Sequence, residues 1–142
     1  MKKLNKKGFT IVELVIVIAV IAILAAVLIP TFATVIKKAN DSAALQAARN
    51  EFSNYLAGIE AKDVSGKVGG TYVVEADSTH FFVIKAGEMN TKVFSTKPTA
   101  ETTELVLAGS TATVGDSDIT VQVEGCNTAV KIYEVTYDTT NP

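Results

Sequence analysis

The stretch FTIVELVIVIAVIAILAAVLI, from Phe9 to Ile29, decides the structure of the N-terminal part of the chain. It contains 21 residues and one charged side chain, Glu13. As an α-helix it would be about 32 Å long, close to the roughly 30 Å hydrocarbon core of a bilayer. The sequence therefore predicts a membrane-spanning helix over these residues.

The charges on either side of this segment predict its orientation. Four lysines precede it, at positions 2, 3, 6 and 7, whereas Lys37 and Lys38 follow after a short gap. Because basic residues are retained on the cytoplasmic side, we expect a single-pass helix with its N-terminus inside and the remaining chain outside.

Two ordinary interpretations of the segment leave Glu13 unexplained. A secretory signal peptide has a shorter apolar region and an A-x-A-like cleavage site, and no such triplet occurs here. A plain signal anchor fits the length and the flanking charges. An ionised carboxylate near mid-bilayer costs about 2.5–3.5 kcal/mol on insertion scales, so a simple anchor would be expected to carry an apolar residue at this position.

The residues KKGFTIVEL, from Lys6 to Leu14, closely resemble the prepilin processing site of type IV pilins and their pseudopilin relatives. The resemblance extends to about Ala39 and includes Pro30, where the helix of the family bends. It implies that a prepilin peptidase cleaves after Gly8 and methylates the new amine of Phe9. It also implies a pilin fold, in which a long helix packs on a β-rich head.

The resemblance also gives Glu13 an expected role in assembly. Cleavage would leave a positive amine on Phe9 in apolar surroundings, and the amine of one subunit would lie beside Glu13 of a neighbour. Because a buried charge without its partner is strongly destabilising, such a pair would set the register between subunits.

The function implied by the resemblance is that of a structural subunit of a type IV pilus-like surface filament, a helical homo-oligomer. Its expected partners are the prepilin peptidase, an assembly ATPase and a membrane platform protein. The subunit would reside in the cytoplasmic membrane before assembly and on the cell surface afterwards, where the family serves adhesion, twitching motility, biofilm formation or DNA uptake. Two alternatives remain open, namely a pseudopilin of a type II secretion or competence apparatus and a membrane-anchored extracellular binding module.

The expected fold class is α+β, with four segments along one small unit. These are a cleaved basic leader at 1–8, a transmembrane or filament-core helix at 9–29, an amphipathic helix at 30–62 and a β-rich head at 63–142.

In the amphipathic helix, apolar residues recur every three or four positions and form a stripe that should cover the sheet. Polar side chains should occupy the other faces. The stripe comprises Leu45, Ala48, Phe52, Leu56 and Ile59, with Tyr55 adjoining; the polar set comprises Lys37, Lys38, Asp41, Gln46, Arg49, Asn50, Glu51 and Asn54. The helix should end at Gly58 or at the break formed by residues 64–66.

Beyond Gly69 the hydrophobic pattern changes to that of strands. Strands are expected at 71–76 and 80–85, joined by a hairpin loop at 77–79, and at 119–124 and 129–137, joined by a turn at 125–127. A shorter strand at 92–96 is possible, and 103–108 is either a strand or part of a loop. The alternation predicts an antiparallel sheet with one covered and one solvated face. The Ser/Thr-rich stretches 96–103 and 109–117 are expected to be exposed loops.

Composition and motifs give little support to other functions. Removal of the four leader lysines takes the formal charge from −2 to −6, and the remaining basic residues are scattered, so no direct nucleic-acid binding is predicted. No motif of an enzyme appears, and no cofactor or metal site is predicted.

His80, the sole histidine, is interpreted as structural. Cys126, the sole cysteine, is interpreted as a small hydrophobe in a turn, and the alternative is an intermolecular bridge or attachment point. Asp116 and Asp118 are weak calcium candidates without an EF-hand pattern.

Overall fold

The computed structural model describes residues 8–61, 70–120, 123, 126 and 129–139. The chain divides into two compact units, which we call the N-terminal unit (Met1–Ala39) and the head unit (Asn40–Pro142). The division differs from the four segments expected from the sequence, whose boundaries stay predictions.

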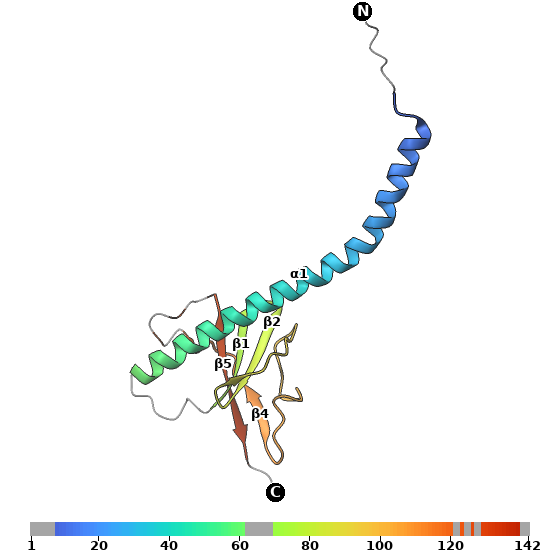
Figure 1. Ribbon diagram of the computed structural model, residues 1–142. Helices are drawn as coiled ribbons and strands as arrows, with labels where there is room; N and C mark the ends of the chain where they lie inside the picture. The colour runs from blue at the N-terminus through green and yellow to red at the C-terminus, as the bar shows by residue number, and fades with distance from the viewer. Residues whose placement is uncertain (1–7, 62–69, 121–122, 124–125, 127–128, 140–142) are drawn as a thin grey trace, which may run out of the picture. The chain divides into compact units, whose positions relative to one another are not determined.

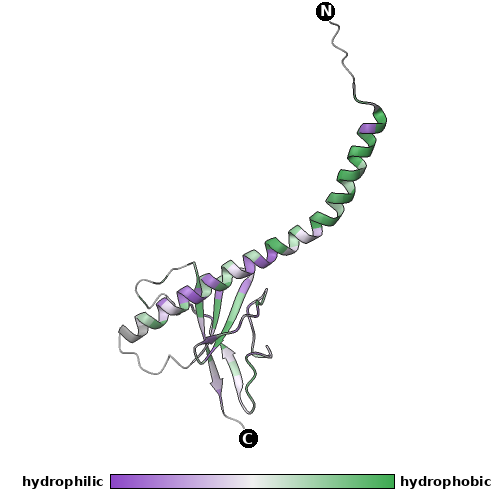
Figure 2. Cartoon of the chain, in the orientation of Figure 1, coloured by the Kyte–Doolittle hydropathy of each residue, from purple (hydrophilic) through white to green (hydrophobic). Residues whose placement is uncertain are grey.

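One α-helix, α1, runs from Ile11 to Ala61. In the N-terminal unit, its side chains are exposed almost throughout, including the large apolar ones. Figure 2 shows nearly continuous apolar colour along this part of the helix. By length and composition α1 can cross a membrane. Its apolar surface has no cover within its own unit, as expected for a helix whose solvent is lipid or other helices.

Pro30 lies inside α1 without ending it. Proline lacks the N–H that would bond the carbonyl four residues earlier, and its ring crowds that turn. Two threonines follow at once and add bonds to nearby carbonyls: Thr31 Oγ1 donates to Leu28 O at 2.9 Å, and Thr34 Oγ1 to Pro30 O at 2.8 Å. Hydroxyls of this kind help a helix to tolerate proline in an apolar setting. The bend expected at Pro30 stays a prediction.

The head unit contains a five-stranded antiparallel sheet with the order β3-β2-β1-β5-β4 (Figure 1). The strands are β1 (Thr71–Asp77), β2 (His80–Lys85), β3 (Glu88–Met89), β4 (Thr111–Val114) and β5 (Lys131–Asp138). The central strand β1 pairs with β2 through a tight hairpin and with the C-terminal strand β5 on its other side. The α+β fold class predicted from the sequence is confirmed.

The C-terminal part of α1 covers one face of this sheet. Its buried residues Ala44, Ala48, Phe52 and Tyr55 pack against side chains of β1, β2 and β5. The rings of Phe52 and Tyr55 lie 5.5 and 6.0 Å from the ring of Tyr72 on β1, within the range of favourable aromatic pairs. The predicted stripe therefore meets the sheet, although the side chain of Ile59 lies outside the described residues.

The other face of the sheet is also buried, which corrects the expectation of a solvated face. A second apolar cluster joins Val73, Val83 and Val135 to Leu105 of the long connection between β3 and β4. The sequence of β2, HFFVIK, is apolar at four consecutive positions, all buried. A near-continuous apolar strand is typical of a sheet covered on both sides, whereas strict alternation indicates one wet face.

Several strand predictions need correction. The possible strand at 92–96 has only an isolated bridge between Phe94 and Phe81. The segment 103–108 lies in a loop, which is one of its two predicted states. The stretch 109–117, expected to be an exposed loop, contains β4. Of the expected strand at 119–124, the described residues Ile119, Thr120 and Val123 are not in a strand, and the others lie outside the described residues. The short strand β3 was not expected.

The helix also continues beyond Gly58, one of its two predicted ends. A Cβ placed on Gly58 would lie 2.0 Å from Cγ1 of Val123. This glycine therefore allows a close approach between α1 and a loop, and it does not cap the helix.

Candidate processing and assembly site

Gly8, Phe9 and Thr10 precede the helix and are exposed. A Cβ added to Gly8 would meet no atom within 4 Å, and the side chain of Phe9 is 93% exposed. The peptide bond expected to be cleaved is therefore outside regular secondary structure, where a peptidase can bind it in extended form. This exposure of the Gly8–Phe9 peptide bond is observed within the N-terminal unit alone.

Thr10 and Glu13 form a reciprocal capping box at the start of α1. Glu13 N–H donates to Thr10 Oγ1 at 3.2 Å, and Thr10 N–H donates to Glu13 Oε2 at 3.1 Å. Thr10 is thus the N-cap and Glu13 the third helical residue, an arrangement that satisfies two backbone donors left without helical partners. The Thr10 hydroxyl also donates to Oε2, at 3.2 Å.

The sequence interpretation overlooked this role, although T-I-V-E matches the S/T-x-x-E pattern of a capping box. Both hydrogen bonds that the Glu13 carboxylate accepts from Thr10 fall on Oε2, and Oε1 can therefore accept from a further donor. Capping and pairing with a neighbour are compatible.

The surface around Glu13 is apolar and slightly hollowed. Phe9, Glu13, Leu14, Ile16 and Val17 line a hollow of about 430 Å³ on the N-terminal unit. A carboxylate bordered by such side chains is a suitable place for a cation attached to an apolar group. The amine of a cleaved N-terminal phenylalanine has that chemistry.

In the head unit, His80 lies between two carboxylates. Its Nδ1 is 2.8 Å from Asp77 Oδ1, and its Nε2 is 3.0 Å from Asp41 Oδ1. The hydrogen bond to Asp77 raises the pKa of His80; burial opposes the rise, and the bond to Asp41 and the charges of both carboxylates add to it. The sequence did not indicate the partner of His80 on α1, Asp41.

Glu51 departs from its predicted place on the polar face of α1. Its side chain is buried, 4% exposed, near the thiol of Cys126. Burial, followed by the charge of Glu51 and a hydrogen bond to it, raises the pKa of Cys126. The thiol is therefore protonated and poorly nucleophilic at neutral pH. Glu51 lies three residues after buried Ala48 and four before buried Tyr55, so helical spacing alone could have located it.

The structure gives Asp116 and Asp118 different surroundings. Asp118 Oδ1 accepts from the Thr120 backbone at 2.9 Å, the Thr120 hydroxyl at 2.7 Å and the Ile132 backbone at 3.1 Å. Asp116 is fully exposed, with Oδ1 3.9 Å from Lys97 Nζ. Across the described residues no group of three or more His, Cys, Asp or Glu side chains is placed to hold a metal ion. Asp118 therefore stabilises its loop against β5.

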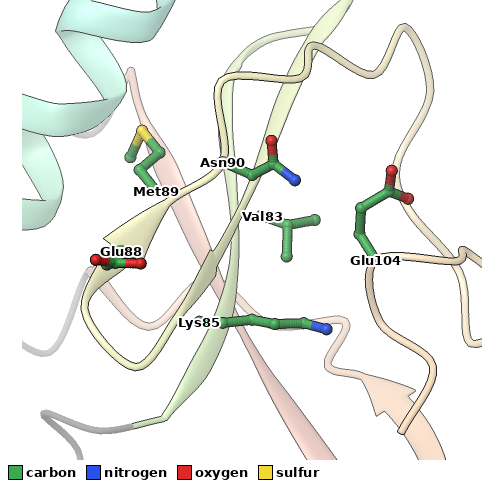
Figure 3. Close-up of a pocket in the computed structure, with 6 residues that line it drawn as sticks. All are labelled: Val83, Lys85, Glu88, Met89, Asn90 and Glu104. Carbon is green, nitrogen blue, oxygen red and sulfur yellow. The ribbon is translucent and has the colours of Figure 1, made fainter.

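A second hollow, of about 350 Å³, lies on the head unit beside β2 and β3 (Figure 3). Its lining mixes both charges with apolar groups: Val83, Lys85, Glu88, Met89, Asn90 and Glu104. Glu104 forms an ion pair with Lys92. The hydrogen bond from Lys92 is the main cause of the lowered pKa of Glu104, and burial opposes this shift. This lining offers no nucleophile paired with a base, so it does not resemble a catalytic centre.

Comparisons with known proteins concern the N-terminal segment. A family model described as the prokaryotic N-terminal methylation motif matches residues 3–29. The type IV wide pilus major component PilA4 of Thermus thermophilus is 66% identical over 38 residues, which cover 27% of this chain and 29% of that protein. The matched segment thus spans less than a third of that relative. No solved structure matches the chain significantly.

Proposed function

We propose that this chain, a member of the type IV pilin family by its N-terminal motif, is a structural subunit of a pilus-like surface filament. One observation carries the proposal: an exposed Gly8–Phe9 bond immediately precedes a capped helix whose apolar first part, up to Ile29, holds a single carboxylate, Glu13. The methylation motif and the pilus component of Thermus thermophilus support the same function.

Processing is the first step of the proposed pathway. A prepilin peptidase cleaves after Gly8 and methylates the amine of Phe9. The exposed, non-helical backbone at 8–10 supports it, because a protease binds its substrate in extended form. The four lysines of the leader keep this end on the cytoplasmic side while the head unit is exported.

Assembly is the second step, and it transfers α1 from lipid to neighbouring helices. Lipid tails are as apolar as the side chains of α1, so close packing and polar contacts must favour the filament over the membrane. An assembly ATPase and a platform protein supply the work of extraction. The pair between Glu13 and a neighbour's Phe9 amine gives the helices a defined register, because a shifted register leaves both charges without a partner in an apolar environment.

The mature N-terminus provides the primary test. Mass spectrometry of the chain from its own host should identify N-methylated Phe9 as the first residue. Gly8→Val should accumulate the uncleaved precursor in the membrane, because the added branched side chain obstructs approach of the peptidase to the backbone. An intact Met1, or a mature N-terminus near Pro30, would contradict the proposal and favour a membrane-tethered binding module.

Two substitutions at Glu13 separate its two roles. Glu13→Val removes both the cap and the charge, whereas Glu13→Gln retains an acceptor for the Thr10 N–H and removes only the charge. We expect both variants to be inserted and cleaved, and neither to form filaments. Normal filaments from Glu13→Gln would exclude the ion pair while leaving the processing proposal intact.

The location of the polymer distinguishes a pilus from a pseudopilus. Long filaments sheared from the cell surface and composed mainly of this chain would support the pilus subunit. Retention of the processed chain in the cell envelope, with loss of secretion or DNA uptake on its deletion, would instead indicate a pseudopilin.

A further inference from the structure

His80 joins two elements of the head unit that are distant in sequence. Asp77 belongs to β1 and Asp41 to α1, 39 residues before the histidine. Thr79 lies beside the ring, with its hydroxyl 3.1 Å from Nδ1. The charged groups that act on the imidazole are these two carboxylates. The side chain of His80 is 16% exposed, and those of Asp41 and Asp77 are 28% and 52% exposed.

The number of protons on the ring determines whether both contacts are hydrogen bonds. A neutral imidazole carries one N–H and one lone pair, whereas an imidazolium carries two N–H groups. Since both ring nitrogens face carboxylate oxygens at about hydrogen-bond distance, only the imidazolium can donate to both. In the neutral form, one carboxylate faces a lone pair.

The geometry indicates which contact the neutral form keeps. Nδ1 lies 2.8 and 2.9 Å from the two oxygens of Asp77, and the Thr79 backbone and hydroxyl also hold that carboxylate, at 2.8 and 2.9 Å. Asp41 makes one contact, at 3.0 Å, from a different element. The remaining proton therefore stays on Nδ1, and the lone pair of Nε2 faces Asp41.

We propose that Asp41, His80 and Asp77 form a proton-dependent clasp that holds α1 to the β1–β2 hairpin when the imidazole is protonated and releases Asp41 when it is not. Asp41 is the second residue of the head unit, one helical turn before the first buried residue, Ala44. When the clasp is closed, the contact between α1 and the sheet therefore begins at Asp41 instead of at Ala44. Opening it frees about one turn.

The direction of the pH dependence follows from the ion pairs. The pKa of His80 is raised above 6.5, first by its hydrogen bond to Asp77. The contribution of the clasp to stability is complete below the ordinary histidine pKa and is lost as pH rises through the raised value. Acid therefore closes the clasp and alkali opens it, in a pH range above the ordinary histidine pKa of 6.5.

A titration by NMR provides the first test, because His80 is the sole histidine and gives a single imidazole signal. In the full-length chain in detergent micelles, we expect an imidazole pKa above 6.5. Asp41→Asn and Asp77→Asn should each lower it, whereas Glu101→Gln, at an exposed acid in another loop, should not. A wild-type value at or below 6.5, or no response to Asp41→Asn, would overturn the proposal.

Amide hydrogen exchange provides the second test and distinguishes the clasp from a merely structural contact. Protection factors correct for the intrinsic pH dependence of exchange. Around residue 41 they should fall in the wild type as pH rises through the pKa of His80 measured in the titration. Asp41→Asn should remove this fall, because an asparagine amide can accept from an imidazolium and donate to a neutral ring. The same fall in wild type and Asp41→Asn, or none in the wild type, would contradict the clasp.

Discussion

Thr10 is the N-cap of α1, beside the expected cleavage site. Its hydroxyl accepts the Glu13 N–H at 3.2 Å, and its own N–H bonds to the Glu13 carboxylate. These bonds fix the helix to begin at Ile11 and leave Gly8 and Phe9 outside it. The same carboxylate that we expect to pair with a neighbour is thereby held in a defined position.

Thr10→Val tests this role of the hydroxyl. Valine has nearly the same shape but offers no acceptor to the Glu13 N–H, so the first turn should lose about 1 kcal/mol of stability. Amide exchange of residues 11–14 in the full-length chain in micelles would show the loss as reduced protection. Thr10→Ser, which retains the hydroxyl, is the matched control, and equal protection in Thr10→Val and Thr10→Ser would show that the hydroxyl contributes nothing.

At the scale of elements, the sheet is held between two different layers. On one face the amphipathic part of α1 supplies Phe52 and Tyr55, and on the other the β3–β4 connection supplies Leu105. Lys97 ties that connection to the sheet: its Nζ donates to Gly115 O at 2.8 Å and lies 3.8 Å from the centre of the Tyr133 ring. Among the described residues, α1 thus covers one face of the sheet and the long β3–β4 connection covers the other.

Because of the contact between α1 and Val123, we expect Gly58→Ala to change stability in the direction opposite to that given by helix propensity. Gly→Ala inside a helix ordinarily stabilises it by about 1 kcal/mol. At Gly58 the added Cβ would lie 2.0 Å from Cγ1 of Val123, so the loop must shift, at a cost of about 1–3 kcal/mol. We expect Gly58→Ala to lower the free energy of unfolding, measured with denaturant on the full chain in micelles.

The double variant Gly58→Ala/Val123→Ala provides the control. Truncation of Val123 removes the atom that the new Cβ would meet, so adding Gly58→Ala to Val123→Ala should be neutral or stabilising. If Gly58→Ala is equally destabilising with and without Val123, the close approach is not the cause.

At the scale of the whole molecule, two buried tyrosines report on the two layers. Burial, above all, raises the pKa of Tyr55 on α1 to about 12, and burial followed by the hydrogen bond to Glu75 raises the pKa of Tyr133 on β5 to about 12. Tyr133 Oη donates to Glu75 Oε2 at 2.8 Å. Both groups remain neutral in the folded state at pH values where the unfolded chain ionises.

The head unit should therefore lose stability between pH 10 and 12. Below pH 10 the phenols are protonated in both the folded and the unfolded state. Above pH 10 ionisation lowers the free energy of the unfolded state but not that of the folded state. Each tyrosine therefore lowers the free energy of unfolding by on the order of 2 kcal/mol. Urea unfolding of the full chain in micelles should show a smaller loss over this range for Tyr133→Phe. Tyr137→Phe, a partly buried tyrosine on the same strand, is the control. An identical loss in wild type and Tyr133→Phe would contradict the assignment.

Features carried by neighbouring residues could be predicted well. The apolar helix, the β1–β2 hairpin and the last strand are all local patterns, and the structure contains each of them. The two-residue strand β3 and the polar strand β4 could not be predicted. β4 has the sequence TATV and exists because it pairs with β5, so its signal lies in a partner about 20 residues away in the chain.

The sequence by itself determined the apolar helix that begins at Ile11, because a capping pattern and a long apolar run are local features of composition and spacing. It also determined that an amphipathic helix would cover a β-sheet. Only the tertiary structure decided that both faces of the sheet are buried, that Glu51 lies inside, that Gly58 permits a close approach and that His80 meets Asp41. The physical reason is that periodicity identifies an apolar side of an element but not its partner. Contacts between distant residues depend on the packing of the whole head unit.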